Sequence, residues 1–224
     1  MSVVWHTFDE AHEAFHVLAA HTSTMLLQAK HDRGGAHLVL SGGRTPVQYL
    51  PVLAASLDDW HGISVSLSDE RWVPLTHPDS NEDMVREHFL SLAPGAEFAG
   101  MMGSGDDVAR DAERADGAYR ALARPSDVTI LGAAPDGHVA SLFPGHPSVF
   151  GDAQVIATTS TTGEARLSLS APALLSTRQV FIVTSGQDKR DTLKKAMSAE
   201  LVSDLPVRLL LAQDRVPVTV LDYD

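Results

Sequence analysis

Short apolar runs, each ending in a polar turn, recur along the chain, and this alternation restricts the fold more than any other feature of the sequence. The four clearest runs lie at residues 37–40 (HLVL), 63–67 (ISVSL), 127–131 (DVTIL) and 180–184 (VFIVT). Helical patterns follow them, and strands that alternate with helices build βα units around a mostly parallel sheet. We therefore expect an α/β fold in which helices flank a mostly parallel sheet.

The segments around these runs predict further helices and two closing strands. Thr7 and Glu10 have the spacing of a capping box at the start of a first helix, and Gly34 would end it. The other segments with clear patterns are helices from Pro46 and Asn81, a helix over 107–123, and strands over 207–211 and 216–221. No repeat or long linker interrupts the chain, so residues 1–224 are expected to form a single domain.

Composition excludes several classes of protein. The 224 residues include 17 Lys and Arg against 29 Asp and Glu, and the net charge of −12 argues against partners such as nucleic acid or an anionic membrane surface. The chain has no cysteine, which excludes disulfides and thiolate metal sites. No apolar stretch reaches membrane-spanning length and the N-terminus shows no signal-peptide pattern, so a cytoplasmic location is expected.

The turn at residues 41–46 (SGGRTP) has the residue types of an anion site. Gly42 and Gly43 let backbone N–H groups approach a ligand, while Thr45 and Pro46 suit the start of a helix. Free N–H groups at a helix N-terminus favour phosphate. A strand-to-helix turn that binds nothing fits the same residues equally well.

Two further turns carry groups that can move protons. In the turn at 68–74 (SDERWVP), Arg71 could grip an anion, and Asp69 or Glu70 could move protons or hold sugar hydroxyls. A surface salt-bridge cluster is the alternative. In the turn at 132–138 (GAAPDGH), His138 stands where the chain enters a helix expected over 139–143. A neutral imidazole there could take a proton from water near pH 7.

Lys189 and Arg166 are the remaining basic candidates. Lys189 lies in the first turn of a helix that Ser185 is expected to cap, where a cation opposes the helix dipole unless it faces a bound anion. Arg166 opens a strand over 166–169. Each of these charges could equally be solvated and without a ligand.

Other catalytic schemes lack their sequence patterns. The chain has no HExxH or EF-hand spacing and no G-x-S-x-G elbow, so no zinc hydrolase, calcium site or serine esterase is predicted. His12 and His16 are spaced for one helix face, but no third ligand is indicated. We therefore expect no metal site and interpret them as a surface pair.

Taken in order, five segments resemble those of the 6-phosphogluconolactonases, within the wider glucosamine-6-phosphate isomerase/lactonase superfamily. They are LSGGRTP, SDERWVP, HPDSNEDMVREHFL, LGAAPDGHVASLFPGHP and RLSLSAPALLSTRQVFIVTSGQDK. The stretches DGHVASLFPG and DERWVP resemble the lactonase branch rather than the deaminase branch. Ala134 departs from the pattern, because the family usually has a second glycine there.

The resemblance implies a Rossmann-like sheet and hydrolysis of 6-phosphogluconolactone to 6-phosphogluconate in the pentose phosphate pathway, with no cofactor. It places the general base at His138 and Asp69 beside the reacting centre, where Asp69 would orient His138 or contact ring hydroxyls. Backbone N–H groups near Gly132 are a candidate for stabilising the oxyanion. The residues it assigns to the phosphate are Ser41, Gly42, Gly43, Arg44, Thr45, Arg71, Lys189 and, less directly, Arg166.

Two other functions fit the same fold. An amino-sugar-phosphate deaminase would share the phosphate turn, and a non-catalytic sugar-phosphate sensor could keep that turn while losing His138 and Asp69. The DGHVASLFPG and DERWVP stretches count against the deaminase, and the presence of both His138 and Asp69 counts against the sensor. The sequence does not distinguish a monomer from a homo-oligomer.

Overall fold

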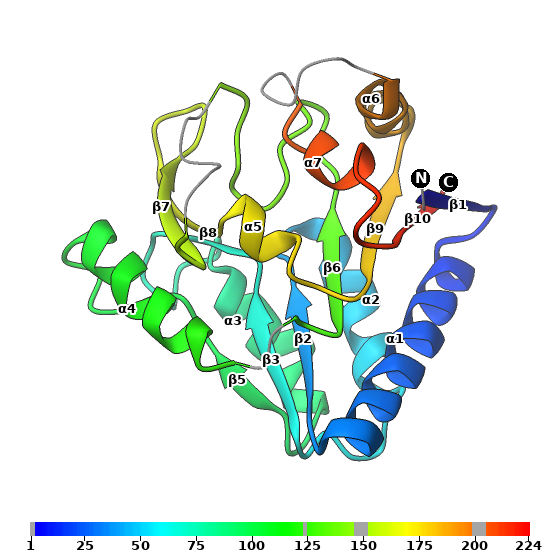
Figure 1. Cartoon of the computed structure of the whole chain (residues 1–224), viewed down its shortest axis with the longest axis horizontal. Coiled ribbons are helices and arrows are strands. Elements are labelled where there is room, and N and C mark those ends of the chain that lie inside the picture. Colours follow the sequence, from blue (N-terminus) through cyan, green and yellow to red (C-terminus); the bar gives the residue numbers. More distant parts are fainter. Residues whose placement is uncertain (1–2, 123–124, 146–151, 199–204) are drawn as a thin grey trace.

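The computed structural model describes residues 3–122, 125–145, 152–198 and 205–224, and its centre is a parallel seven-stranded sheet ordered β1-β10-β9-β6-β2-β3-β5. The strands are β1 (Val3–Phe8), β2 (Ala36–Leu40), β3 (Ile63–Leu67), β5 (Glu97–Ala99), β6 (Val128–Gly132), β9 (Val180–Ser185) and β10 (Val218–Tyr223). The arrowheads of β2, β6 and β9 point to the upper side in Figure 1. This arrangement confirms the expected Rossmann-like α/β fold.

A second, smaller sheet is antiparallel. Its first strand, β4, follows β3 directly in the chain. It joins β4 (Asp69–Arg71), β8 (Ala165–Leu169) and β7 (Val155–Thr159) in the order β4-β8-β7. The sequence suggested only a turn at residues 68–74. These residues are extended because β8, almost a hundred positions further on, supplies the backbone partners that a local pattern cannot reveal.

Helices cover the main sheet and its edges. They are α1 (Ala11–Arg33), α2 (Arg44–Ala54), α3 (Asn81–His88), the 3-10 helix η1 (Leu90–Leu92), α4 (Val108–Arg120), α5 (Ala171–Leu174), α6 (Gln187–Ser198) and α7 (Arg208–Leu211). Helix α1 packs on β1, β2, β6 and β10, and α2 packs between α1 and α3. Figure 1 shows α4 beside β7 at the opposite side of the molecule from α1. No helix within the described ranges is both long and apolar enough to cross a membrane.

The core runs on both faces of the main sheet. Every residue of β2 is buried, which is typical of a central parallel strand between two layers. Trp60 and Phe89 are fully buried, and their rings meet edge to face with centroids 4.8 Å apart. The core side chains form one continuous cluster, in which residues of the strands pack against residues of the helices.

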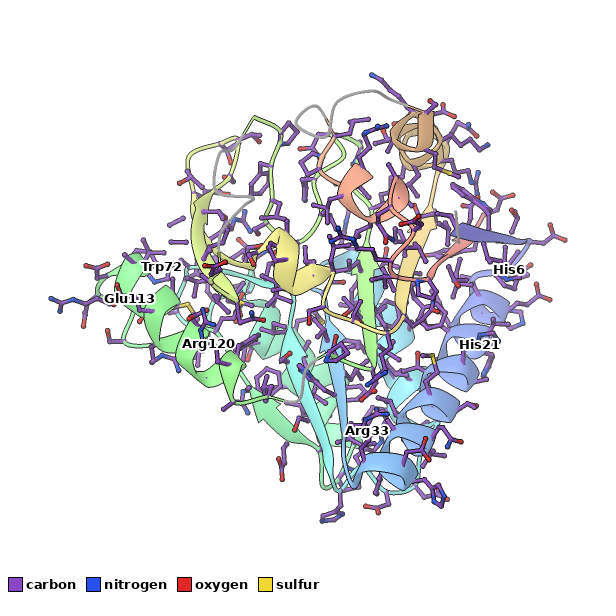
Figure 2. All side chains as sticks on the ribbon, viewed as in Figure 1. His6, His21, Arg33, Trp72, Glu113 and Arg120 are labelled. Carbon is purple, nitrogen blue, oxygen red and sulfur yellow. The ribbon has the colours of Figure 1, made fainter. Side chains whose placement is uncertain are left out.

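The two edges of the sheet differ in what they hold. At the amino-terminal edge, Asp127 forms an ion pair with Arg33 from the end of α1, and it accepts a hydrogen bond from the His37 backbone N–H at 2.9 Å. Figure 2 shows Arg33 at the lower end of the sheet, away from the strand arrowheads. These contacts are structural, and the cavities described below lie at the carboxyl edge.

The first helix begins later than the sequence suggests. Residues 3–8 form β1, which pairs with β10 along its whole length, and α1 begins at Ala11 with no side-chain cap from Glu10. The capping-box prediction at Thr7 is wrong because pairing with a strand at the far end of the chain takes these residues into the sheet. The predicted end is confirmed, since Gly34 closes α1 with a φ of 79°.

The closing segments are predicted in part. The expected strand over 216–221 is confirmed as β10, whereas most of the segment 207–211 is the short helix α7. A short apolar run fits a buried strand or a buried helix equally well, and here no neighbouring strand pairs with it. The helix expected over 107–123 is confirmed as α4, which Asp107 caps, and its predicted end at residue 123 lies outside the described residues.

Candidate active site

Two adjoining hollows at the carboxyl edge of the main sheet gather all ten predicted site residues. The Arg71 hollow, of about 260 Å³, is lined by Ser41, Gly42, Gly43, Asp69, Arg71, Asn81, Gly132, Ala133, Ala134, His138, Ala140, Ser141, Phe143 and Arg166. The Lys189 hollow, of about 520 Å³, is lined by Gly42, Gly43, Arg44, Thr45, Pro46, Gln48, Gly132, Ala133, Ala134, Pro135, His138, Val183, Ser185, Lys189 and Tyr223. His138 and the two glycines line both hollows, so the two spaces meet at the imidazole.

The 41–45 turn leads from β2 into α2 and lines both hollows. Gly43 occupies the N-cap position with a φ of 109°, and no side chain caps the helix. The prediction that Thr45 caps α2 is therefore wrong, because the left-handed cap conformation that glycine permits lets the helix begin at Arg44. The first turn of α2 has no acidic residue, and its N–H groups are available to an anion.

His138 is held by a carboxylate from its own turn. Asp136 Oδ1 lies 2.7 Å from His138 Nδ1 and accepts a hydrogen bond from the His138 backbone N–H at 3.2 Å. Gly137, with a φ of 78°, makes this tight turn possible. An acceptor at Nδ1 favours the tautomer in which Nε2 is unprotonated and can accept a proton. Nε2 has no hydrogen-bond partner among the described residues.

The segment after His138 is not the helix predicted over 139–143. Val139 and Leu142 form an isolated antiparallel bridge, and Ala140 between them has a φ of 51°. This left-handed residue interrupts a helical path. The resulting turn places Phe143 against His138, with ring centroids 4.8 Å apart, so the imidazole has an apolar wall on one side. His146 and Pro147, which end the motif, lie outside the described residues.

Asp69 is buried and bound to two hydroxyls rather than to the imidazole. Its Oδ1 accepts from Ser68 Oγ at 2.8 Å, and its Oδ2 accepts from Ser141 Oγ at 2.7 Å. The orienting carboxylate of His138 is therefore Asp136, which the sequence indicated only as a turn residue. The signal that could have identified it is the Asp-Gly-His spacing, which lets a carboxylate bond back to the residue two positions on.

Glu70 is fully buried and organises the start of α3. Its Oε1 accepts from the backbone N–H of Arg71 and of Asn81, each at 2.7 Å, and its Oε2 accepts from the Glu82 N–H at 2.7 Å and from Ser80 Oγ at 3.2 Å. Of the two carboxylates in the 68–74 segment, Glu70 is thus structural. It ties β4 to α3.

The burial of Glu70 predicts a pH dependence of stability. Burial raises the pKa of this carboxyl from 4.5 to about 7, against the opposing effect of its backbone N–H partners. A group with a higher pKa in the folded state takes up a proton on folding, so its contribution to the unfolding free energy falls as pH rises from about 4.5 to about 7. The expected loss is roughly 3 kcal/mol.

Urea unfolding at pH 5, 6, 7 and 8 measures this effect by comparing the wild type with Glu70→Gln, which cannot ionise. The unfolding free energy of the wild type should fall relative to that of Glu70→Gln as pH rises across this range. A constant difference would show that Glu70 keeps one protonation state throughout.

Arg71 and Arg166 stand opposite each other on the small sheet. They are direct partners in the β4–β8 ladder, and both line the Arg71 hollow. Arg71 Nη1 donates to the Asp79 carbonyl at 2.6 Å. Arg166 forms an ion pair with Glu164 at 2.8 Å, and this hydrogen bond lowers the pKa of the Glu164 carboxyl. The predicted basic residues are therefore divided between the two hollows, because Arg71 and Arg166 line one and Lys189 lines the other.

Lys189 lies in the first turn of α6 and lines the hollow that bears its name, together with Arg44 and the two glycines. No salt bridge or hydrogen bond of its ammonium occurs among the described residues. The prediction that Ser185 caps this helix is not met, because Ser185 is the last residue of β9 and Gly186 (φ 88°) separates it from α6.

Comparison with known proteins identifies the family. A family model described as glucosamine-6-phosphate isomerases/6-phosphogluconolactonase matches residues 9–219. The chain belongs to this family. A 6-phosphogluconolactonase of Pseudomonas aeruginosa is 37% identical over 211 residues, which cover 91% of this chain and 87% of that protein. The resemblance seen in the motifs is confirmed.

Solved structures of the family share the fold. The crystal structure of a 6-phosphogluconolactonase from Shewanella baltica has a TM-score of 0.95 and 34% identity, and the match covers 99% of this chain and 98% of that one. A monomeric glucosamine-6-phosphate deaminase has a TM-score of 0.83 at 18% identity, covering 98% of this chain and 97% of that one. Because the fold is common to both activities, the chemistry has to be argued from the site.

Proposed function

We propose that the protein hydrolyses 6-phospho-D-glucono-1,5-lactone to 6-phosphogluconate. The observation that carries this proposal is the imidazole of His138, which a carboxylate holds at Nδ1 and which stands where the two hollows meet. The relatives in Pseudomonas aeruginosa and Shewanella baltica carry the lactonase name, which supports the same reaction.

The Lys189 hollow suits the phosphate group. Phosphate there can accept from the free N–H groups of the 41–45 turn and from the start of α2, with Lys189 and Arg44 adding opposite charge. The lactone ring would then lie in the Arg71 hollow, with Arg71, Arg166 and Asp69 facing its hydroxyls. This arrangement refines the sequence-based assignment by moving both arginines from the phosphate to the ring.

The reaction needs one proton to move twice. His138 Nε2 takes a proton from a water molecule as the water oxygen bonds to the lactone carbonyl carbon. The bond from that carbon to the ring oxygen then breaks, and the imidazolium returns the proton to the departing oxygen as the hydroxyl of the open chain. Asp136 stabilises the imidazolium between these steps because its carboxylate lies against Nδ1.

Freshly prepared lactone in a pH-stat, with the spontaneous rate subtracted, tests the proposal. Acid release above background that saturates with substrate is the expected result. A second arm measures ammonia released from glucosamine-6-phosphate, which the deaminase alternative requires. Binding of 6-phosphogluconate without any turnover of the lactone would instead favour a non-catalytic sugar-phosphate protein.

Asp136→Asn should lower kcat about tenfold, since a charge-assisted hydrogen bond in a partly exposed pair lies at the low end of its range, near 1.5 kcal/mol. The amide can hold the ring in place but stabilises the imidazolium less. The measurement is kcat for the lactone in a pH-stat, with the spontaneous rate subtracted. A kcat equal to that of the wild type would show that Asp136 does not act on His138.

A further inference from the structure

Asn81 links the two hollows although neither its residue type nor its motif suggested a role in the site. It is the first residue of α3, is only 1% exposed and lines the Arg71 hollow. It lies between β4, which carries Asp69 and Arg71, and the 41–45 turn. Nothing in the reaction described above uses it.

Two hydrogen bonds fix Asn81 to β4. Its backbone N–H donates to Glu70 Oε1 at 2.7 Å, and its side-chain Nδ2 donates to the Asp69 carbonyl oxygen at 2.8 Å. A carbonyl oxygen needs a donor, so this contact decides which atom of the amide is nitrogen. The other atom, Oδ1, therefore faces away from β4.

The side-chain oxygen of Asn81 is buried against Gly42. Oδ1 has no hydrogen-bond partner among the described residues. A Cβ built on Gly42 would stand 1.7 Å from this oxygen and 2.1 Å from the amide carbon. Gly42, unlike Gly43, does not have a left-handed φ. The three atoms nearest to such a Cβ all belong to the Asn81 amide.

We propose that Asn81 is a positioning residue that holds the 41–45 turn at a fixed distance from β4. A buried polar atom without a partner lowers stability and calls for an explanation. Here the Asn81 amide is bonded to β4 and packs against Gly42, so the place of β4, with Asp69 and Arg71, determines the place of Gly42. The two ends of one ligand are thereby held at a set separation before it binds. The inference rests on the proposed function, because it takes the ligand to be a phosphorylated sugar that spans both hollows.

Asn81→Ala should raise KM for the lactone and Kd for 6-phosphogluconate about tenfold, because the turn then has to be ordered on binding. The value of kcat should stay within about threefold, since the His138 turn is untouched. Thermal unfolding run beside the kinetics shows that the variant is folded at the assay temperature. If Asn81→Ala fails to fold, Asn81→Ser, which keeps a small donor facing Asp69, takes its place.

A double-mutant cycle with Gly42→Ala makes the test specific. In the wild-type background the new methyl group must displace the Asn81 amide, so we expect Kd to rise about tenfold or more. In the Asn81→Ala background the amide that meets the methyl group is gone, so the same substitution should raise Kd by a clearly smaller factor than in the wild type. Gly117→Ala in α4 is the control, because nothing lies near its absent Cβ and it lines neither hollow, so Kd should not change in either background.

Binding of 6-phosphogluconate, measured by calorimetry, separates this inference from the proposed function. If the wild type binds 6-phosphogluconate but does not turn over the lactone, the proposed function fails while the coupling between Asn81 and Gly42 is still measured. If the effects of the two substitutions on Kd simply multiply, or if folded Asn81→Ala binds as tightly as the wild type, the positioning role is overturned.

Discussion

Replacing His138 with alanine should lower kcat for lactone hydrolysis by about 10²–10⁴ while leaving Kd for 6-phosphogluconate within about threefold. In the proposed reaction the imidazole acts only at the reacting carbon, so its loss should remove proton transfer and little binding energy. Turnover is measured in a pH-stat against the spontaneous rate, and binding by calorimetry.

His61→Ala is a matched control for this variant. His61 is held by Asp59 two positions earlier, with both its backbone N–H and its Nδ1 against the same carboxylate oxygen, as His138 is held by Asp136. It lines neither hollow. The control should retain wild-type kcat. A His138→Ala protein with near-normal kcat would remove the imidazole from the mechanism.

Lys189→Ala should weaken the binding of 6-phosphogluconate by roughly 10- to 100-fold, since a hydrogen bond to a charged group contributes about 1.5–3 kcal/mol. The corresponding KM for the lactone should rise with little change in kcat, because in the proposed placement the ammonium binds the phosphate equally before and during the reaction. Affinity for gluconate, which lacks the phosphate, should not change.

Arg71→Ala separates the ring from the phosphate. If Arg71 faces the ring hydroxyls, its loss should weaken gluconate and 6-phosphogluconate in similar proportion. Lys195→Ala removes a charge from the same helix as Lys189 but lies outside both hollows, and it should bind as the wild type does. Equal weakening of both sugars by Lys189→Ala would contradict the placement of phosphate at this lysine.

The location of the site could be predicted from the sequence because it follows from one rule of α/β sheets. Polar turns that follow parallel strands meet at one edge, so the sequence alone predicts that the turns after β2, β3, β6 and β9 lie together. His138, Lys189 and the Gly42-Gly43 pair all lie where this rule puts them. The resemblance to a family then gave each of them a role.

The parts that escaped prediction depend on distant partners. The pairing of β1 with β10, and of β4 with β8, joins segments far apart in the chain, so no local pattern signals either. The contacts of Asp136 and Asn81 were hidden as well. Asp136 meets the imidazole of His138 two positions on, and Asn81 packs against Gly42, thirty-nine positions earlier. Their residue types are common in turns and at helix starts, which hides such roles.

The small antiparallel sheet has a consequence for how the protein can diverge. Arg71 and Arg166 stand on a three-stranded ladder that shares no strand with the seven-stranded sheet, whereas the 41–45 turn and Lys189 extend directly from the main sheet. Side chains of the β7–β8 hairpin can therefore change while the 41–45 turn and Lys189 keep their places on the main sheet. On the proposed placement of the ligand, such changes would alter which sugar ring fits and leave the contacts with the phosphate in place.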